Sequence, residues 1–375
     1  MTARADPMIF GAPMIPDAAR LTGLMAETLA AGWFSNGGAL HMRLEQALTG
    51  RQRPEDAVAL ASSGTMALML ALKLGGLKPG GEVITSPLGF AATAQAIEWC
   101  GLVPVFADVE PETLTLCPLA ARAAMTPRTV AILPVHMLGV PCDVWAFDRL
   151  CREHGLWLAY DAAHAFDIVL DGQPIGSFGD CSAFSLHATK ILHTGEGGFV
   201  VARRAQVDSL RQLRNFGFRN GRAAGPGING KMSELNAAMG LALLPDLAAE
   251  VATRKALRLV YDAALAGVPG LRLHRQRPEA SVSAGYYTLR LAPAARARLH
   301  AALAEAGIMA RDHFPLLCGP GTPWPSAQIV TGGVGPPVAP ALAPEILCLP
   351  LHGRLSASAA AHIAGVVRRT LEEAA

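Results

Sequence analysis

The sequence predicts an α/β protein whose mostly parallel sheet is flanked by helices on both faces. Between residues 58 and 201, short runs of β-forming apolar residues alternate with helix-forming stretches. This alternation is typical of a parallel sheet with crossover helices. The chain has 375 residues, a length that favours about two domains. We expect a large domain in residues 1–248 and a smaller C-terminal α+β domain in residues 249–375.

The expected strands of the large sheet are spaced so that a helix or loop fits between them. They are Val58–Ala61, Glu82–Ser86, Val103–Ala107, Val130–Val135, Leu156–Tyr160, Ser182–Ser185 and Gly198–Val201. Beyond them we expect a mobile or ligand-facing loop, helices, two further strands and a surface excursion. These are, in turn, the loop Asn215–Gly230, the helical stretch from Ser233 to about Ala266, the helices Arg296–Ala306 and Ser356–Glu373, the strands Tyr286–Leu291 and Glu345–Pro350, and the excursion Gly319–Pro344.

The composition argues against several classes of protein. The formal net charge is +2 and no basic stripe is present, which argues against nucleic acid as a ligand. Only 17% of residues are charged, against about 25% in soluble domains, so part of the surface is expected to meet a partner subunit. The richest apolar run, Met66–Leu77, is interrupted by Lys73 and two glycines. It is too short for a membrane span.

The cysteines and the N-terminus favour a cytoplasmic location. The seven cysteines are scattered and form no C-x-x-C pair, which favours reduced thiols. The first twenty residues lack a basic segment followed by an apolar core, so we expect no secretory signal.

Residues 225–230 match the dinucleotide-binding pattern G-x-G-x-x-G, but this match is discarded. The pattern binds a dinucleotide only after a strand and at the start of a helix, with an acidic residue farther on. Here it follows a polar loop. No P-loop, H-E-x-x-H or G-x-S-x-G pattern occurs either, and we expect no metal.

Two polar features follow predicted strands. Residues Ser62-Ser63-Gly64-Thr65 come after a strand and open a helix, so their backbone N–H groups could hold a phosphate. An ordinary N-cap is the alternative. Asp161 follows another strand, which puts its carboxylate at the ligand-binding edge of the sheet, although an Asp there can also form a cap or turn.

Lys190 is the third feature. It ends the run Ser-Leu-His-Ala-Thr-Lys and precedes Gly195-Glu-Gly-Gly198. A lysine among apolar and small residues is expected to be partly buried, which lowers its pKa and makes it a nucleophile. The alternative is a lysine that extends from a helix end to solvent.

The three features occur in the order that pyridoxal 5′-phosphate requires. A helix N-terminus holds the phosphate, a lysine forms an imine, and a carboxylate keeps the pyridine nitrogen protonated so that the ring accepts electrons. Phe90, after the strand that ends near Ser86, is placed to stack on the ring. The combination is much more specific than any one of its parts.

Several segments resemble the DegT/DnrJ/EryC1/StrS sugar aminotransferases, which are pyridoxal phosphate enzymes of fold type I. They are SSGTMALMLAL, PLGFAAT, PVHMLGVPCDV, DAAHAF, SLHATKILHTGEGG, LRNFGF and NGKMSELNAAMGL. The resemblance extends from about Trp33 to Leu351. DAAHAF, HATK and GEGG are most similar to the branch that aminates carbon 4 of dTDP-4-keto-6-deoxyhexoses.

The resemblance implies a role for each matching residue. Lys190 would be the Schiff-base lysine, Asp161 the partner of the pyridine nitrogen, and His164, three residues after Asp161, the contact of the phenolate oxygen. Phe90 would stack on the ring. The other implied contacts are Gly64, Thr65 and Ser185 at the phosphate, Asn229 at the phosphate of the neighbouring subunit, Trp33, Ser35 and Asn36 at the substrate entrance, and Lys231 and His313 at the nucleotide sugar.

The resulting prediction is a homodimeric aminotransferase with active sites shared between subunits. It would move an amino group from L-glutamate to a keto-sugar nucleotide such as a dTDP-4-keto-6-deoxyhexose. One alternative is a free ketone such as a keto-cyclitol, because Lys231 and Arg219 suit a carboxylate as well as a pyrophosphate. Another is a regulator that binds pyridoxal phosphate without turnover, against which the intact Lys190 and Asp161 argue.

Overall fold

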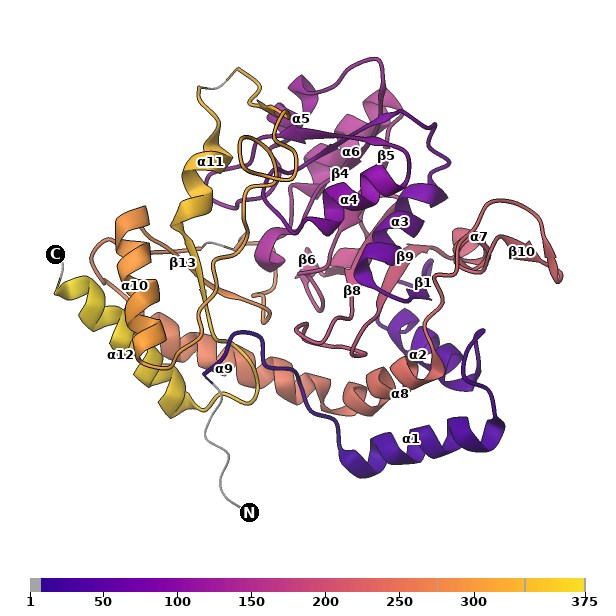
Figure 1. The fold of residues 1–375 in the computed structure, drawn as a ribbon, viewed down its shortest axis with the longest axis horizontal. Coiled ribbons are helices and arrows are strands. Elements are labelled where there is room, and N and C mark those ends of the chain that lie inside the picture. Colours follow the sequence, from indigo (N-terminus) through magenta and orange to yellow (C-terminus); the bar gives the residue numbers. More distant parts are fainter. Residues whose placement is uncertain (1–7, 275, 334, 374–375) are drawn as a thin grey trace.

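An eight-stranded sheet lies at the centre of the protein, in a computed structural model that describes residues 8–274, 276–333 and 335–373 (Figure 1). The strand order is β1-β9-β8-β5-β4-β2-β3-β14. Neighbours are parallel except where β9 pairs with β1 and β8. The bounds are β1 Asp56–Ala61, β2 Glu82–Thr85, β3 Val103–Ala107, β4 Thr129–Leu133, β5 Trp157–Asp161, β8 Cys181–Ser185, β9 Gly198–Arg203 and β14 Ile329–Val330. The predicted α/β class and the seven predicted strands are confirmed, with ends that shift slightly.

Helices cover both faces of this sheet (Figure 1). The helices are α1 Ala18–Ala31, α2 Ala39–Thr49, α3 Gly64–Leu74, α4 Ala92–Trp99, α5 Pro118–Ala123, α6 Val144–His154, α7 Val207–Leu213, α8 Glu234–Leu243, α9 Leu247–Leu265, α10 Pro293–Glu305, α11 Val338–Leu342 and α12 Ala357–Glu372.

The alternation of side chains along β1 decides which helix packs on which face. Leu60 belongs to one hydrophobic cluster with Leu44 of α2, whereas Ala59 belongs to another with Leu68 of α3. The small alanine lets α3 approach the sheet closely. The start of α3 is thereby held at the carboxyl end of β1, where a ligand would bind.

A smaller antiparallel sheet lies in the C-terminal part. It has the order β12-β13-β15, with bounds Arg272–Leu273, Tyr287–Arg290 and Ile346–Leu349. Leu289 packs in one cluster with Tyr261 of α9, Leu299 of α10 and Ile363 of α12. The predicted α+β character of this part is confirmed, and the boundary after residue 248 stays a prediction.

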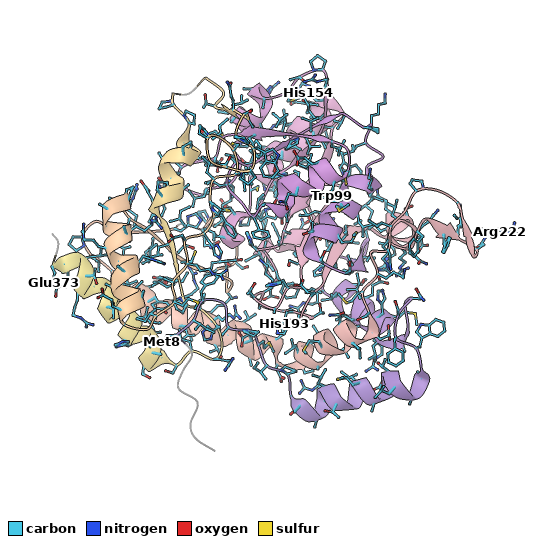
Figure 2. All side chains as sticks on the ribbon, in the orientation of Figure 1. Met8, Trp99, His154, His193, Arg222 and Glu373 are labelled. Carbon is cyan, nitrogen blue, oxygen red and sulfur yellow. The ribbon has the colours of Figure 1, made fainter. Side chains whose placement is uncertain are left out.

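Two segments predicted as irregular contain strands. In the expected surface excursion, β14 pairs in parallel with β3, and Asp108 after β3 accepts hydrogen bonds from the backbone N–H groups of Val338 and Ala339 at 2.6 and 2.9 Å. The segment is therefore anchored to the main sheet. The expected ligand-facing loop carries a hairpin of β10 (Phe218–Arg219) and β11 (Arg222–Ala223), and Figure 2 shows Arg222 at its tip, far from the body of the protein. Another short hairpin pairs β6 (Val169–Leu170) with β7 (Gln173–Pro174).

The helical stretch 234–265 is long and apolar enough, by length and composition alone, to cross a membrane. In the fold it acts as a core helix that links the two parts of the chain along the base of Figure 1. Its α8 half buries Ala237 and Leu243 in the main core. Its α9 half buries Arg254, whose Nε donates to Glu250 at 2.6 Å.

Candidate active site

A cavity of about 440 Å³ lies at the carboxyl ends of β1, β5 and β8. Eight of the site residues predicted from the sequence line it together. They are Gly64, Thr65, Phe90, Asp161, His164, Ser185, Lys190 and His313. The cavity therefore lies at the sheet edge where ligands bind in open α/β folds.

The start of α3 contributes backbone N–H groups to this cavity. Ser63 is the N-cap, and its Oγ accepts from the N–H of Met66 at 3.1 Å. Gly64 and Thr65 face the cavity. A Cβ on Gly64 would lie only 2.9 Å from Cβ of Ser185, so the glycine lets the serine approach. The N-cap interpretation is correct for Ser63, and the exposed helix N-terminus beside it can also bind an anion.

Asp161 is a buried carboxylate at the end of β5, with 4% of its surface exposed. Its Oδ2 accepts from Thr93 Oγ1 at 2.6 Å, and its Oδ1 accepts from the N–H of Ala163 at 3.0 Å. Burial raises the pKa of Asp161, while Thr93, Ala163 and the nearby Lys190 charge oppose that rise. Asp161 thus forms a local turn, which was the alternative considered from the sequence. It also presents its carboxyl group to the cavity.

Lys190 lies in a turn after β8 rather than at a helix end. Its side chain is half-buried, and Nζ donates to the hydroxyl of Tyr286 at 3.2 Å. Burial lowers the pKa of Lys190 to about 8, although the Asp161 charge acts in the opposite direction. A larger share of this amine is therefore unprotonated near neutral pH than in an exposed lysine.

His164 is 6% exposed, and within the described part of the chain its Nδ1 has no hydrogen-bond partner. Its ring stacks on Phe314 with centroids 4.7 Å apart and meets the edge of Tyr286 at 5.2 Å. Burial, together with the Lys190 charge, lowers the pKa of His164 well below its usual value. This shift favours the neutral ring, whose Nδ1 can serve as a hydrogen-bonding group for a ligand.

Phe90 lies just before α4 and is 62% exposed although it lines the cavity. Its backbone oxygen accepts from the hydroxyl and the N–H of Thr93, both at 3.2 Å. The same threonine therefore contacts Asp161 and fixes the backbone that carries the aromatic ring. An exposed ring over a cavity can pack against a planar ligand.

The cavity residues that lay outside the sequence predictions include Phe10, Tyr286, Arg311 and Phe314. Three of them come from C-terminal segments and the fourth from the N-terminal segment, and only packing brings these segments to the central sheet. Thr93 was also missed, although it lies within the PLGFAAT segment and could have been found there.

Five predicted site residues lie outside the cavity of their own chain. Asn229 accepts from Lys231 Nζ at 2.7 Å, and that Nζ lies 4.6 Å from the ring centroid of Phe216. The others, Trp33, Ser35 and Asn36, are exposed in the turn between α1 and α2. The two groups are neighbours, because the N–H of Glu234 donates to the oxygen of Phe34 at 3.0 Å.

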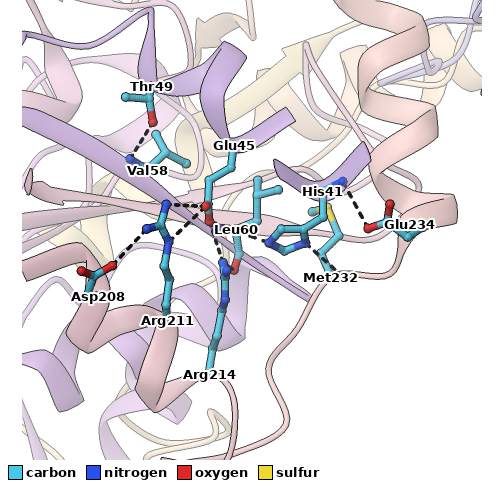
Figure 3. Close-up of polar contacts among 10 residues, drawn as sticks. All are labelled: His41, Glu45, Thr49, Val58, Leu60, Asp208, Arg211, Arg214, Met232 and Glu234. Atoms are coloured by element: carbon cyan, nitrogen blue, oxygen red, sulfur yellow. Dashed lines mark hydrogen bonds and ion pairs between the residues drawn. The ribbon is translucent and has the colours of Figure 1, made fainter. Parts of the chain in front are cut away.

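The segment that carries Asn229 is tied to the core by a buried ionic cluster (Figure 3). Arg214 Nη1 donates to Oε1 of Glu45 at 2.8 Å and to the oxygen of Leu60 in β1 at 2.6 Å. The Arg214 oxygen accepts from the N–H of Gly230, whose own oxygen accepts from the N–H of Ser62, both at 2.8 Å. The cluster thus fixes the end of this segment next to the turn that begins α3.

Comparisons with known proteins agree with this geometry. The DegT/DnrJ/EryC1/StrS aminotransferase family matches residues 17–368. A dTDP-4-amino-4,6-dideoxy-D-glucose transaminase from Shigella dysenteriae is 35% identical over 341 residues, covering 89% of this chain and 91% of that protein. A UDP-N-acetyl-3-dehydro-alpha-D-glucosamine 3-aminotransferase from Acidithiobacillus ferrooxidans is 37% identical over 321 residues, which is 83% of each chain.

A solved structure extends the likeness to the whole fold. The structure of DesI in the presence of its TDP-sugar product has a TM-score of 0.90 at 33% identity and covers 99% of this chain and 95% of that chain. The predicted fold type I architecture is thereby confirmed. The family match, the relatives and this structure together show that the chain is an aminotransferase and belongs to the DegT/DnrJ/EryC1/StrS family.

Proposed function

We propose that this chain uses pyridoxal 5′-phosphate to move an amino group from L-glutamate to the keto group of a nucleotide-linked sugar, such as a dTDP-4-keto-6-deoxyhexose. The observation that carries the proposal is that one cavity holds the Lys190 amine, the Asp161 carboxylate and the N-terminus of α3. The substrate class is supported by the relatives from Shigella and Acidithiobacillus, which are named as aminotransferases of dTDP- and UDP-linked sugars.

The residues present fit pyridoxal phosphate. The N-terminus of α3 with Gly64 and Thr65 offers N–H groups to a phosphate, and Ser185 adjoins them. Asp161 supplies a buried carboxylate. His164 has a buried ring nitrogen without a partner in the described part of the chain, and such a nitrogen fits the hydroxyl group of the ring.

Each residue then has a definite task. The bound cofactor supplies a ring that withdraws electrons from the reacting carbon. Asp161 would hold a proton on the ring nitrogen by its charge, and Phe90 would pack on the ring face. Lys190, with a pKa of about 8, acts first as the nucleophile and afterwards carries a proton. His313 lines the same cavity, where it would contact the sugar.

Arg311 supports a carboxylate-bearing donor such as L-glutamate. Its guanidinium lines the same cavity, and it lies 5.7 Å from the ring centroid of Phe10. The neighbouring Asp312 is paired with Arg296 at 2.5 Å, so that carboxylate is already engaged. Guanidinium groups bind carboxylates in a paired geometry.

The proposal includes a homodimer in which Asn229, Lys231, Trp33, Ser35 and Asn36 serve the neighbouring subunit. These residues lie outside the cavity of their own chain, and large apolar side chains are exposed around them. The apolar side chains are Leu29, Phe34, Met42, Phe216, Phe218, Ile228 and Leu235, each at least 41% exposed. A surface of this kind fits a symmetric interface with a second copy.

A cytoplasmic location is part of the same proposal. All seven cysteines are unpaired, and six of them are buried, as expected of thiols in a reducing compartment.

The experiment loads the protein with pyridoxal phosphate and L-glutamate, removes excess glutamate, and offers a panel of keto-sugar nucleotides and free ketones. Absorbance follows the return from the amino form of the cofactor to the aldehyde form, with Lys190→Ala as the control. Return of the aldehyde form on addition of a keto-sugar nucleotide supports the proposal. Return only with a free keto-cyclitol would contradict the substrate class. Cofactor binding without reaction with any amino donor would identify a regulator instead.

A further inference from the structure

The Lys190 amine has a specific side-chain partner that the motifs did not indicate. Nζ lies 3.2 Å from the Tyr286 hydroxyl and 6.0 Å from its ring centroid. Asp161, whose two oxygens accept from Thr93 and from the N–H of Ala163, forms no ion pair with Lys190 in this structure. Tyr286 comes from the C-terminal part of the chain, so the contact joins that part to the edge of the central sheet.

The position of Tyr286 does not depend on Lys190. Arg258 of α9 donates to the backbone oxygen of Tyr286 at 2.5 Å, which fixes the residue just before β13. Its ring meets His164 edge-on at 5.2 Å and lies 6.2 Å from the ring of Phe10. Backbone and ring are therefore held from three directions, and the hydroxyl is presented to the amine at a fixed place.

The phenol of Tyr286 stays protonated. Burial raises its pKa, and the nearby Asp161 charge acts in the same direction. A neutral hydroxyl can accept a hydrogen bond from an ammonium group and donate one to a neutral amine. One side chain can thus hold the Lys190 nitrogen before and after it loses its proton.

We propose that Tyr286 is a positioning residue whose hydroxyl holds the Lys190 amine inside the cavity in both of its protonation states. The inference rests on the proposed function, in which Lys190 acts as a nucleophile and then carries a proton. A lysine has a flexible four-carbon stem, and without a partner its amine samples many positions. The Tyr286 hydroxyl restricts those positions to the side of the cavity where the amine reacts.

The test measures Lys190 in cofactor-free protein, so that it does not depend on turnover. Competitive acetylation with acetic anhydride across a pH series, followed by peptide mass spectrometry, gives the titration of Lys190, with the exposed Lys255 as an internal reference. In Tyr286→Phe the ammonium loses an acceptor. The hydroxyl also bonds the neutral amine, but hydrogen bonds to charged groups are stronger than neutral ones, so the Lys190 titration should move down by about one pH unit while Lys255 stays unchanged.

Tyr287→Phe is the matched control. It removes a hydroxyl from the next residue, where that group donates to Asp262 at 2.8 Å, away from the cavity. This variant should leave the Lys190 titration unchanged. Tyr286→Gln, which restores a group able to accept from Nζ, should return the titration toward that of the unmodified chain. An unchanged titration in folded Tyr286→Phe, or equal shifts in Tyr286→Phe and Tyr287→Phe, would overturn the proposal.

A second measurement tests whether Tyr286 acts through Lys190. Tyr286→Phe should slow the reaction of pyridoxal phosphate with the otherwise unmodified protein about tenfold, but should not change noncovalent cofactor binding in a Lys190→Ala background. Weaker binding in that background would show that Tyr286 touches the cofactor directly, against the proposal. Failure of the unmodified chain to react with pyridoxal phosphate would contradict the proposed function. The acetylation result would still test the contact between Tyr286 and Lys190, because it is measured without the cofactor.

Discussion

Thr93 Oγ1 lies 2.6 Å from Oδ2 of Asp161, which lines the cavity together with Lys190. The hydroxyl favours the charged form of a carboxylate whose pKa burial would otherwise raise further. The same threonine side chain and backbone hold the oxygen of Phe90. One small side chain therefore supports both the charge and the aromatic ring that the proposed cofactor requires.

Thr93→Val should weaken the reaction by raising the pKa of Asp161. The valine has nearly the same shape but no hydroxyl, so the carboxylate loses a hydrogen bond that favours its charge. We expect the glutamate half-reaction to slow about tenfold, with the acid limb of its pH profile shifted to higher pH. Rapid-mixing absorbance measurements across pH check this.

Thr85→Val is the control for that substitution. Its buried hydroxyl donates to the oxygen of Leu133 at 2.8 Å, so the variant loses a hydroxyl of the same kind without touching Asp161. A comparable shift of the acid limb in both variants would refute the role assigned to Thr93.

Asp161→Asn should cost more than a hundredfold in the rate of amino transfer. A neutral amide cannot hold a proton on the ring nitrogen by its charge, and electrostatic stabilisation of this kind is worth about 3 kcal/mol or more. Single-turnover kinetics with saturating glutamate measure the effect, and circular dichroism verifies the fold. A loss below about tenfold would exclude the proposed charge interaction.

Glu45→Gln should destabilise the protein by about 3–5 kcal/mol, because Arg214 would remain buried without its carboxylate. Both side chains are less than a tenth exposed. Burial raises the pKa of Glu45, but His41, Arg214 and Arg211 outweigh it and hold the pKa well below its usual range. Urea unfolding at fixed protein concentration measures the change. Glu27→Gln, which breaks the exposed pair with Arg43, should cost under about 1 kcal/mol.

The same pair predicts a pH dependence of stability. Because the pKa of Glu45 is lower in the folded than in the unfolded chain, its contribution is fully present above the unfolded value of about 4.3. It is lost as the pH falls below that value toward the folded pKa. The stability difference between the unmodified chain and Glu45→Gln should be largest at neutral pH and shrink in acid. A difference that grew in acid would contradict the ionic account.

A shared active site predicts that two inactive variants restore each other. Lys190→Ala and Asn229→Asp subunits, dissociated and reassembled in equal amounts, should form hybrids in which one of the two sites is native. Random pairing gives about a quarter of native activity. If Asn229 served its own subunit, every hybrid site would lack one of the two residues, and mixed samples would stay inactive while folded and dimeric.

A feature could be predicted from the sequence where residues close together in the chain determine it. The strands and the motifs around Asp161 and Lys190 were predictable, since alternating apolar runs and strand-end polar residues are properties of neighbouring positions. Tyr286 and Arg311 were not, because nothing near them in the chain shows that packing of the C-terminal part brings them to the cavity. Strand β14 has only two residues in a segment rich in Pro and Gly, so no periodicity marks it.

The central claim is that the Lys190 amine is the group that binds the carbonyl carbon of pyridoxal phosphate. The protein is mixed with pyridoxal phosphate and reduced with borohydride. Peptide mapping then locates the attached cofactor. The account predicts attachment at Lys190 and none in Lys190→Ala protein, with Lys73, Lys78, Lys231 and Lys255 unlabelled. Specific attachment at any of those four lysines, or undiminished labelling of Lys190→Ala, would contradict it.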